Sequence, residues 1–529
     1  MSSYDPSSME YKITRIGDEQ STALTNDGSR NGDRKMYFQA ILDYNRIFKE
    51  VHDLNIMFLY NQEQYDINGP TTLFSSLPQR KQGVAGRVSY SYDGRYYIEG
   101  NFGYNGSENF AKGHRFGFFP SIAVGYNISN EKFWQPIKPV ISNLKIRGSW
   151  GLVGNDATNA GRFAYMEDLV LGGSDSYTTG IRQDTYYSGP SWNRYFNPDL
   201  TWEVGEKINL GLDLQLFNDF NLTFDIFREK RRDIFMTREN SIPEIVGTGE
   251  TKITSNNGEM ENKGLDLAID YNKQITKDFF LSFKSTLTFA RNKVLKMDEP
   301  PYFEYPGLSD VGHPLGTYWG YVADGLFPDQ ETIDNSPRQD LGYTPQPGDI
   351  KYVNQPNAKG EYDNVINSND RVAIGHPYDP ELVYGFGPSM KWKNWDFSFF
   401  FQGVARTSFM MYGMHPFGTT SIKNMLQFVA DDHWRVDNPN PNAAYPRLTK
   451  DSNGNNDQYS TYWLRNAAFL KLKNAEIGYT YKGMRFYLSG VNLLTFSPFK
   501  HWDPEMGGGN GLYYPTQRVF NIGFQMTIQ

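Results

Sequence analysis

Apolar and polar residues alternate with a period of two in many short stretches of this chain. The alternation is clearest at the C-terminal end, where five apolar residues are separated by small or polar ones up to Gln529. Successive side chains of a β-strand point to opposite faces, so the pattern predicts a strand with one apolar and one polar face, as in a barrel closed in a membrane. Its lipid-facing residues would be Phe520, Ile522, Phe524, Met526 and Ile528.

The same alternation recurs from end to end and predicts an all-β fold. We expect about 15 or 16 antiparallel strands by this template, and the stretches lack strong helical periodicity. The predicted strands begin near Tyr11, Met36, Leu54, Val84, Tyr96, Gly117, Leu144, Glu206, Phe220, Lys263, Phe279, Val383, Trp395, Ala467, Met484 and Arg518.

Connections between the predicted strands alternate between short and long. Tight turns are predicted at Asp93-Gly94, Asn218-Asp219, Lys393-Asn394 and Lys482-Gly483. Outer-membrane barrels have short periplasmic turns and long extracellular loops, so this asymmetry favours a transmembrane barrel over a soluble sandwich or propeller. The long connections cover residues 154–203, 232–260, 293–381, 407–465 and 496–517.

Aromatic residues gather beside the short turns. An amphipathic ring is well placed at the level of the lipid headgroups, so we interpret these residues as a periplasmic girdle. Aromatic residues also favour strands in general, which is the simpler interpretation. The predicted girdle consists of Phe217, Phe220, Trp392, Trp395, Tyr479 and Tyr481.

The composition agrees with a wall between lipid and water. Only 39% of the 529 residues are apolar and the mean hydropathy is -0.61, yet aromatic residues reach 16%. Disordered chains are poor in aromatic residues, so disorder does not explain the low hydropathy. The length suits several domains or one very large barrel. No apolar run approaches the roughly 18 residues of a membrane helix.

Other classes of protein and site are disfavoured. The formal charge of -8 and the lack of a basic run argue against a nucleic-acid binder. Cysteine is absent, which removes disulfides, thiol nucleophiles and thiolate metal sites. The segment after Met1 is polar and does not resemble a secretory signal, although an outer-membrane protein must be exported. We therefore expect that a signal was removed or that the natural beginning lies outside this chain.

Ordered motifs between about residue 117 and the C-terminus resemble one family. Each motif is weak alone, but their common order is a strong signal. They include Leu144-Lys145-Ile146-Arg147-Gly148-Ser149-Trp150-Gly151, Asn197-Pro198-Asp199-Leu200-Thr201-Trp202-Glu203, Glu261-Asn262-Lys263-Gly264-Leu265-Asp266, Pro347-Gly348-Asp349-Ile350-Lys351-Tyr352, Phe469-Leu470-Lys471-Leu472-Lys473-Asn474, Gly490-Val491-Asn492-Leu493 and Asp503-Pro504-Glu505. Together they resemble the C-terminal half of the barrel of SusC/RagA-type TonB-dependent outer-membrane transporters.

The resemblance implies a function and a setting. It implies a barrel of 22 strands in the outer membrane of a Gram-negative bacterium, of which residues 1–529 would be the C-terminal portion. The plug, the TonB box and the first barrel strands would be supplied by a missing N-terminal part or another chain. Such a transporter imports oligosaccharides or peptides, is energised indirectly by TonB, and is covered by a SusD-like surface lipoprotein. Outer-membrane lipid is a further partner, and no nucleic acid or cofactor is implied.

Two alternatives stay open. The barrel could be a non-transporting scaffold that holds surface lipoproteins or assembly factors. The chain could also be a secreted carbohydrate-active β-protein, which would have to be soluble without detergent.

One departure from the family concerns a metal. Members often carry a calcium-loop-like motif after the segment that corresponds to Gly348–Tyr352. Here residues 353–363 lack the alternating acids that would supply oxygen ligands, so we expect no metal. Gln529 also departs from the aromatic residue common at barrel ends.

We expect no catalytic site. Asp431-Asp432-His433 is best explained as a solvated loop, and Glu203 with Glu206 as structural or lumenal residues. The glycine-rich run 507–511 lacks the strand-to-helix context of a phosphate loop and is read as a flexible loop.

Aromatic residues in the loops are the candidates for substrate contact. Rings among polar residues suit the apolar C–H faces and the hydroxyl edges of sugars, and would also suit a peptide. Packing within the loops or against a lid is an equally good interpretation. The candidates are Tyr186, Tyr187, Trp192, Trp319, Tyr321, Trp502, Asp503 and Tyr513.

Overall fold

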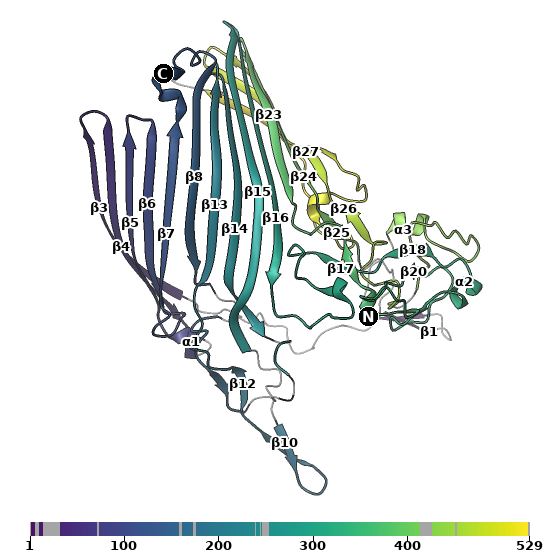
Figure 1. Ribbon diagram of the computed structural model, residues 1–529. Helices are drawn as coiled ribbons and strands as arrows, with labels where there is room; N and C mark the ends of the chain where they lie inside the picture. The colour runs from purple at the N-terminus through teal and green to yellow at the C-terminus, as the bar shows by residue number, and fades with distance from the viewer. Residues whose placement is uncertain are drawn as a thin grey trace.

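One antiparallel sheet of 15 strands dominates the fold and curves from edge to edge (Figure 1). The computed structural model describes residues 2–5, 10–13, 32–70, 73–157, 161–172, 176–238, 240–243, 245, 253–412, 426–449 and 452–526. The sheet follows chain order: β3 (Gly32–Phe48), β4 (His52–Asn68), β5 (Gln79–Tyr92), β6 (Tyr96–Ser107), β7 (Phe116–Asn127), β8 (Ile141–Asn155), β13 (Glu203–Leu216), β14 (Phe220–Arg238), β15 (Ile253–Thr276), β16 (Phe279–Lys296), β23 (Leu382–Trp392), β24 (Trp395–Ala405), β27 (Phe469–Tyr481), β28 (Met484–Phe496) and β29 (Val519–Met526).

Short strands outside this sheet pair two by two. They are β1 (Ser2–Asp5) with β2 (Glu10–Ile13), β9 (Asp168–Val170) with β12 (Ser191–Arg194), β10 (Ser176–Thr179) with β11 (Thr185–Ser188), β17 (Tyr318–Gly320) with β22 (Val372–Ile374), β18 (Ala323–Leu326) with β20 (Ile350–Tyr352), β19 (Arg338–Gln339) with β21 (Val365–Ile366), and β25 (Ser408–Met410) with β26 (Leu464–Asn466).

Helices are few and short. They are α1 (Leu73–Ser76), α2 (Gln330–Asp334), α3 (Gln427–Asp431) and the 3-10 turns η1 (Ile128–Asn130), η2 (Lys132–Trp134), η4 (Pro306–Leu308), η5 (Ser368–Asp370) and η6 (Pro504–Met506). Among the described residues, no helix is long and apolar enough to cross a membrane.

The predicted all-β fold is confirmed, with one correction. Fifteen of the predicted strands form the large sheet, but the strand expected near Tyr11 does not. It is the four-residue strand β2, which pairs with β1 in a separate hairpin. Four alternating residues are too short to distinguish a barrel strand from a local hairpin, because both show the same period. The strand that ends the chain is also present as β29; Ile528 lies outside the described residues.

The short turns lie together at one end of the sheet, at the top of Figure 1, and the long connections lie at the other. At the turns the backbone is left-handed: Asp93 and Gly94 have φ of 51° and 60°, and Lys482 and Gly483 have φ of 46° and 80°. Two successive residues with positive φ form the type of turn whose twist matches that of the flanking strands. These local sequences therefore set the hairpin registers.

The strand registers separate an apolar face from a polar face. Leu212 is paired with Ile146 and Phe224, and Leu267 is paired with Phe224 and Leu287. Paired residues share a face of a sheet, so these five apolar residues form one row across five strands. Residues Phe520, Ile522, Phe524 and Met526 lie on this same apolar face, since their partners include Phe486 and Leu488.

Aromatic residues continue the apolar face at the short-turn end. The rings of Trp395 and Tyr479 are 4.8 Å apart, and those of Phe486 and Phe524 are 5.1 Å apart. Six residues at paired positions form a row across six neighbouring strands. They are Phe279, Trp392, Trp395, Tyr479, Phe486 and Phe524. Three predicted girdle residues, Trp392, Trp395 and Tyr479, thus lie at the level of the turns, as do Phe217 and Tyr481; Phe220 begins β14. Their contact with headgroups stays a prediction.

Toward the long connections the apolar face becomes charged. Arg228 follows Ile226 on this face and pairs with Glu261 at 2.6 Å, while Lys230 pairs with Glu259 at 2.9 Å. A membrane strand needs only roughly 9–11 residues. The 24 residues of β15 are more than twice that length, and ion pairs replace apolar side chains toward the long connections.

We predict that Leu267→Arg destabilises the barrel by about 2–4 kcal/mol, because the charge would lie near the middle of the apolar face. Thr286→Arg is the matched control: it lies at a similar height on the polar face, opposite Ala268, and we expect less than about 1 kcal/mol. Equilibrium urea unfolding of the protein in phospholipid vesicles measures both. Equal losses for the two variants would contradict the assignment of the faces.

Candidate substrate-contact loops and polar wall

The polar face carries cations that are neutralised by carboxylates across neighbouring strands. Arg147 on β8 contacts Asp213 at 3.2 Å and Asp225 at 2.6 Å. It reaches Asp225 across β13 because Gly211 lies between them; a Cβ there would be 2.5 Å from the Arg147 guanidinium carbon. Near the other edge, Arg485 is bound by Asp396 and Glu476. On the polar face these cations are thus paired with carboxylates of neighbouring strands.

The connections after β16, β24 and β28 pack into one body, which we call the loop cluster (Figure 1, lower right). It has its own apolar core, formed by residues of the connections and not of the large sheet. Because the core draws on all three connections, they are held in fixed relative positions. Its buried residues include Tyr321, Leu326, Ile350, Tyr352, Ile366, Ile374, Phe409, Met410, Met411, Val429, Trp434, Tyr445, Trp463 and Phe499.

A buried carboxylate joins two of these connections. Asp349 is fully buried and accepts a hydrogen bond of 2.7 Å from Nε of Arg447. The side-chain amides of Asn453 and Asn456 donate to the same carboxylate at 3.0 and 2.8 Å. A buried charge is tolerated only when it is paired and hydrogen-bonded, and these four residues fulfil that condition together.

A buried lysine fixes the third connection. Nζ of Lys471, at the start of β27, donates to Asp503 at 2.6 Å and to Glu505 at 2.5 Å. Burial alone would raise the pKa of Asp503, but hydrogen bonds from Lys471 and Thr516 lower it below its usual range. The pKa of Glu505 is lowered in the same way by Lys471 and Lys473, against the effect of burial. The segment around η6 is therefore tied to the sheet by charge.

Five of the predicted contact residues lie in the loop cluster. Trp319 donates from Nε1 to Asp310 at 2.6 Å, and Trp502 donates from Nε1 to the carbonyl of Gly507 at 2.9 Å. Tyr321 is buried in the core, and Asp503 is the partner of Lys471. These four support the cluster from within, whereas Tyr513 is 58% exposed and lines a cavity.

The other three lie on two hairpins that extend away from the sheet, at the bottom of Figure 1. Tyr186 and Tyr187 are on β11, and the ring of Tyr187 stacks on Tyr177 of β10 at 5.2 Å. Trp192 on β12 stacks on Tyr195 at 5.5 Å. The structure therefore does not bring these residues together with Tyr513. Their role in binding substrate or lid stays a prediction.

A cavity lined by tyrosines was missed by the sequence analysis apart from Tyr513. Its volume is about 300 Å³, and its five tyrosines come from separate segments of the loop cluster. The rings of Tyr318 and Tyr459 meet edge to face at 6.5 Å. Burial raises the pKa of Tyr318 to about 12, with neighbouring phenols adding to the effect. The tyrosines are Tyr318, Tyr378, Tyr412, Tyr459 and Tyr513.

The glycine-rich run forms one wall of this tyrosine cavity. Gly507 and Gly508 line it, and the backbone N–H of Gly509 donates to Met410 at 2.8 Å. A Cβ on Gly508 would lie 2.3 Å from the carbonyl oxygen of Met410, so only glycine allows this close approach. The run expected as a flexible loop is therefore attached to β25.

The residues of the calcium-loop-like segment do not fit a calcium ion. The two carboxylate oxygens of Asp370 accept backbone N–H groups of Gln355 and Asn367 at 2.7 and 2.8 Å, and Asp363 accepts that of Val365. Across the described part of the chain, no group of three or more His, Asp or Glu suits a metal.

The acidic candidates have structural contacts. Glu203 is buried and accepts from Asn155 at 2.9 Å and from the backbone of Phe235 at 3.0 Å. Glu206 accepts from Trp150, and His433 hydrogen-bonds the carbonyl of Ala430 at 2.9 Å.

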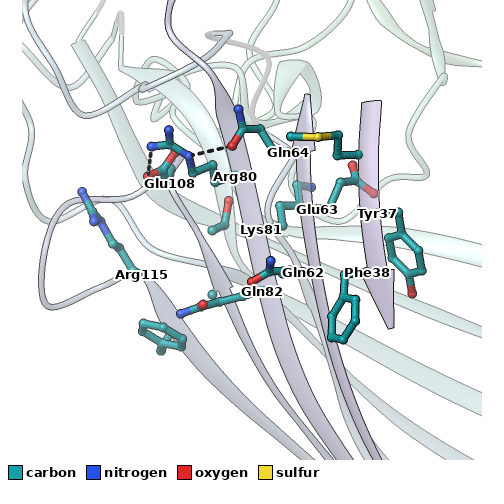
Figure 2. A pocket seen from close by; sticks show the side chains of 14 residues that line it. Tyr37, Phe38, Gln62, Glu63, Gln64, Arg80, Lys81, Gln82, Glu108 and Arg115 are labelled. Carbon is teal, nitrogen blue, oxygen red and sulfur yellow. Dashed lines mark hydrogen bonds and ion pairs between the residues drawn. The ribbon is translucent and has the colours of Figure 1, made fainter. Parts of the chain in front are cut away.

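A larger cavity, of about 540 Å³, lies near the edge strand β3 (Figure 2). Figure 2 shows Arg80 between Glu108, 3.8 Å away, and Gln64, to which its Nε donates at 3.3 Å. Gln62 and Gln82 are in register with Phe38 and Phe116, on the apolar face. Because it opens largely on that face, we do not assign this cavity to a substrate in the lumen.

Comparison with known proteins identifies close similarity over most of the chain. The family described as "TonB dependent receptor-like, beta-barrel" matches residues 2–493. The TonB-dependent receptor P3 of Formosa agariphila is 27% identical over 478 residues, which is 84% of this chain and 45% of that protein. The TonB-dependent receptor SusC of Bacteroides thetaiotaomicron is 29% identical over 468 residues, 83% of this chain and 43% of that protein.

Among solved structures, the RagAB peptide importer in the 'open-open' state has the same fold. The TM-score is 0.72 at 21% identity, and the match covers 96% of this chain and 56% of that one. At that identity the match shows the fold alone. The chain spans about half the length of the curated relatives it matches.

We predict that Asp349→Ala opens the loop cluster and leaves the large sheet intact. Arg447 would keep a charge that is mostly buried and unpaired, which costs about 3–5 kcal/mol. Hydrogen exchange of the detergent-solubilised protein should show lost protection in the loop cluster, including β18 and β20, and unchanged protection in the large sheet. Asp340→Ala is the control, because its ion pair with Arg338 is exposed and is worth at most about 1 kcal/mol. Unchanged protection in Asp349→Ala would contradict the prediction.

We predict that acid releases the segment around η6. The pKa values of Asp503 and Glu505 are lowered in the folded protein. Their stabilising effect is therefore present above the ordinary carboxylate pKa of about 4 and lost as the pH falls through the lowered values. Hydrogen exchange corrected for its intrinsic pH dependence measures the release.

The variant Lys471→Met tests the sign of this effect. Without the lysine, burial would raise the pKa of both carboxyl groups. The segment around η6 should then exchange its amide hydrogens fast at neutral pH, and the exchange should slow as the pH falls and the carboxyl groups become protonated. The same acid release in the variant and the wild type would refute the role of Lys471.

Proposed function

The chain belongs to the TonB-dependent receptor β-barrel family, and we propose that it forms the wall and extracellular loops of a SusC-like importer of an oligomeric nutrient. The family consists of transporters and receptors in the outer membrane of Gram-negative bacteria. The resemblance to SusC/RagA-type transporters covers the barrel region. We expect no catalytic activity.

The two-faced sheet is the observation that carries this proposal. An apolar row runs through Leu212, Phe224 and Leu267 on one face, and paired charges such as Arg147 with Asp225 lie on the other. A sheet of this kind separates lipid from a water-filled lumen. Because the wall charges neutralise one another, the lumen would let a polar oligomer pass without holding it.

The loops would provide recognition at the extracellular end. We expect a SusD-like lipoprotein to cover them, as the resemblance to SusC/RagA-type transporters implies. The hairpins that carry Tyr186, Tyr187 and Trp192 extend furthest from the sheet (Figure 1) and offer exposed rings to a lid. Exposed aromatic residues of this kind mark interaction surfaces.

Transport would be energised by TonB through a plug inside the barrel, supplied together with the remaining barrel strands. The polar wall offers the exposed Lys391, on β23, as a group for contact with such a plug.

We predict that deleting this gene abolishes growth on one class of neutral oligosaccharide or peptide as sole nutrient, and that deleting the TonB gene has the same effect. Growth on the corresponding monomer is the control, because small solutes pass through general porins. The measurements are growth and uptake of labelled oligomers.

Two outcomes would contradict import. Normal uptake of every oligomer in the deletion strain would refute it. Loss of surface lipoproteins without loss of uptake would instead favour the scaffold alternative.

A further inference from the structure

We propose that the tyrosine cavity of the loop cluster is a subsite for one neutral sugar ring of the imported oligomer. This inference rests on the proposed function and selects between the two substrate classes that the function leaves open. It is argued from the shape, the chemistry and the construction of the cavity.

The volume of the cavity suits a single ring. At about 300 Å³ it lies at the lower end of the roughly 300–1,000 Å³ range of ligand pockets. Its tyrosines come from segments before β23, after β25 and before β29. A ligand in the cavity would therefore touch several connections at once, as expected of a binding site and not of a gap within one loop.

The lining is aromatic, hydroxylated and uncharged. Besides five tyrosines it contains only Met410, Met506, Gly507 and Gly508, and no Asp, Glu, Lys, Arg or His of the described residues. The flat face of a phenol can cover the C–H face of a sugar, and its hydroxyl can both donate and accept. A charged ligand would lose water without gaining a counter-ion, at a large cost in free energy.

A peptide fits these groups less well. Its backbone presents fixed N–H and C=O groups, which are usually met by a strand edge or by backbone groups. Here Gly509 N–H is already bonded to Met410 and its carbonyl accepts from Tyr412 at 3.1 Å. The backbone of Gly509 is therefore already paired with β25 and its neighbour Tyr412, and does not offer a peptide a free strand edge.

The rings are held ready for a ligand. The rings of Tyr412 and Tyr513 both lie beside Gly509, and the ring of Tyr318 packs edge to face on that of Tyr459. The ring of Tyr513 packs beside Gly509, where a Cβ would lie 3.4 Å from it. Such preorganisation reduces the entropy lost on binding.

Tyr513→Ala is the test, with its neighbour as control. Tyr514 is more exposed than Tyr513, is not part of the lining, and accepts a hydrogen bond from Gln517 at 2.8 Å. The full transporter complex, purified in detergent from outer membranes, is applied to an array of neutral oligosaccharides and an array of hexapeptides. Affinities for the bound members are then measured by calorimetry.

We expect neutral oligosaccharides to bind the wild type and Tyr513→Ala to weaken them at least tenfold, about 1.4 kcal/mol. Tyr514→Ala should stay within about twofold, and Tyr513→Phe should lose about threefold, since it keeps the ring and loses one hydrogen bond. Affinity should be flat between pH 5 and 9, because the raised pKa values of Tyr318 and Tyr412 keep those phenols neutral throughout.

Selective binding of peptides, binding of no neutral oligosaccharide, or equal effects of Tyr513→Ala and Tyr514→Ala would each overturn the inference. The deletion strain tests the proposed function independently of Tyr513. If the deletion strain takes up every oligomer, the function fails whatever Tyr513 does. If the deletion strain loses uptake but the Tyr513→Ala strain keeps it, only the sugar-subsite inference is refuted.

Discussion

Backbone hydrogen bonding in lipid is the constraint on which this structure depends. No water reaches the hydrocarbon layer, so every N–H and C=O group there must be paired within the protein. The sheet achieves this through 15 strands in chain order, hydrogen-bonded to their neighbours and joined at one end mostly by tight turns. Among the described residues, β3 and β29 form its two edges and do not pair with each other. In a membrane both edges need partner strands, which is why the expected further strands matter more than any single side chain.

Outside the lipid, water can pair with backbone groups, and the protein is built around a buried core instead of a single sheet. The loop cluster has the apolar core of a soluble domain, and its connections are joined by buried charges that cannot move without losing their partners. Asp349 holds Arg447, and Lys471 holds Asp503 and Glu505. Such pairs add little net stability. However, any arrangement that leaves one of these charges buried and unpaired has a high free energy, so the pairs fix distant loop segments relative to one another. The tyrosine cavity depends on that fixation, because its residues come from separate segments.

Much of the sheet could be predicted because its information is local. Alternation with period two and the residues at the turns identify each long strand, as for β14 between Phe220 and Arg238. The same rule failed near Tyr11, where the pattern was four residues long and gave no partner. The contacts of the loops are not local, so the sequence placed Tyr513 among the candidates but gave no sign of Tyr318, Tyr378, Tyr412 or Tyr459. Likewise, nothing in the glycine run 507–511 shows that it packs on β25.

The distribution of charge suggests a division of labour between wall and loops. Arg147 is satisfied by Asp213 and Asp225, and Arg485 by Asp396 and Glu476, so these parts of the wall offer water and little attraction. A wall that bound its cargo tightly would slow release, because each bound site must be left again. The apolar and hydroxyl groups suited to selecting a ligand are instead gathered in the loops, beyond the height at which Arg228 and Glu261 replace apolar side chains on the lipid face. Under the proposed function, this one arrangement would select a ligand before entry and hold it only weakly during passage.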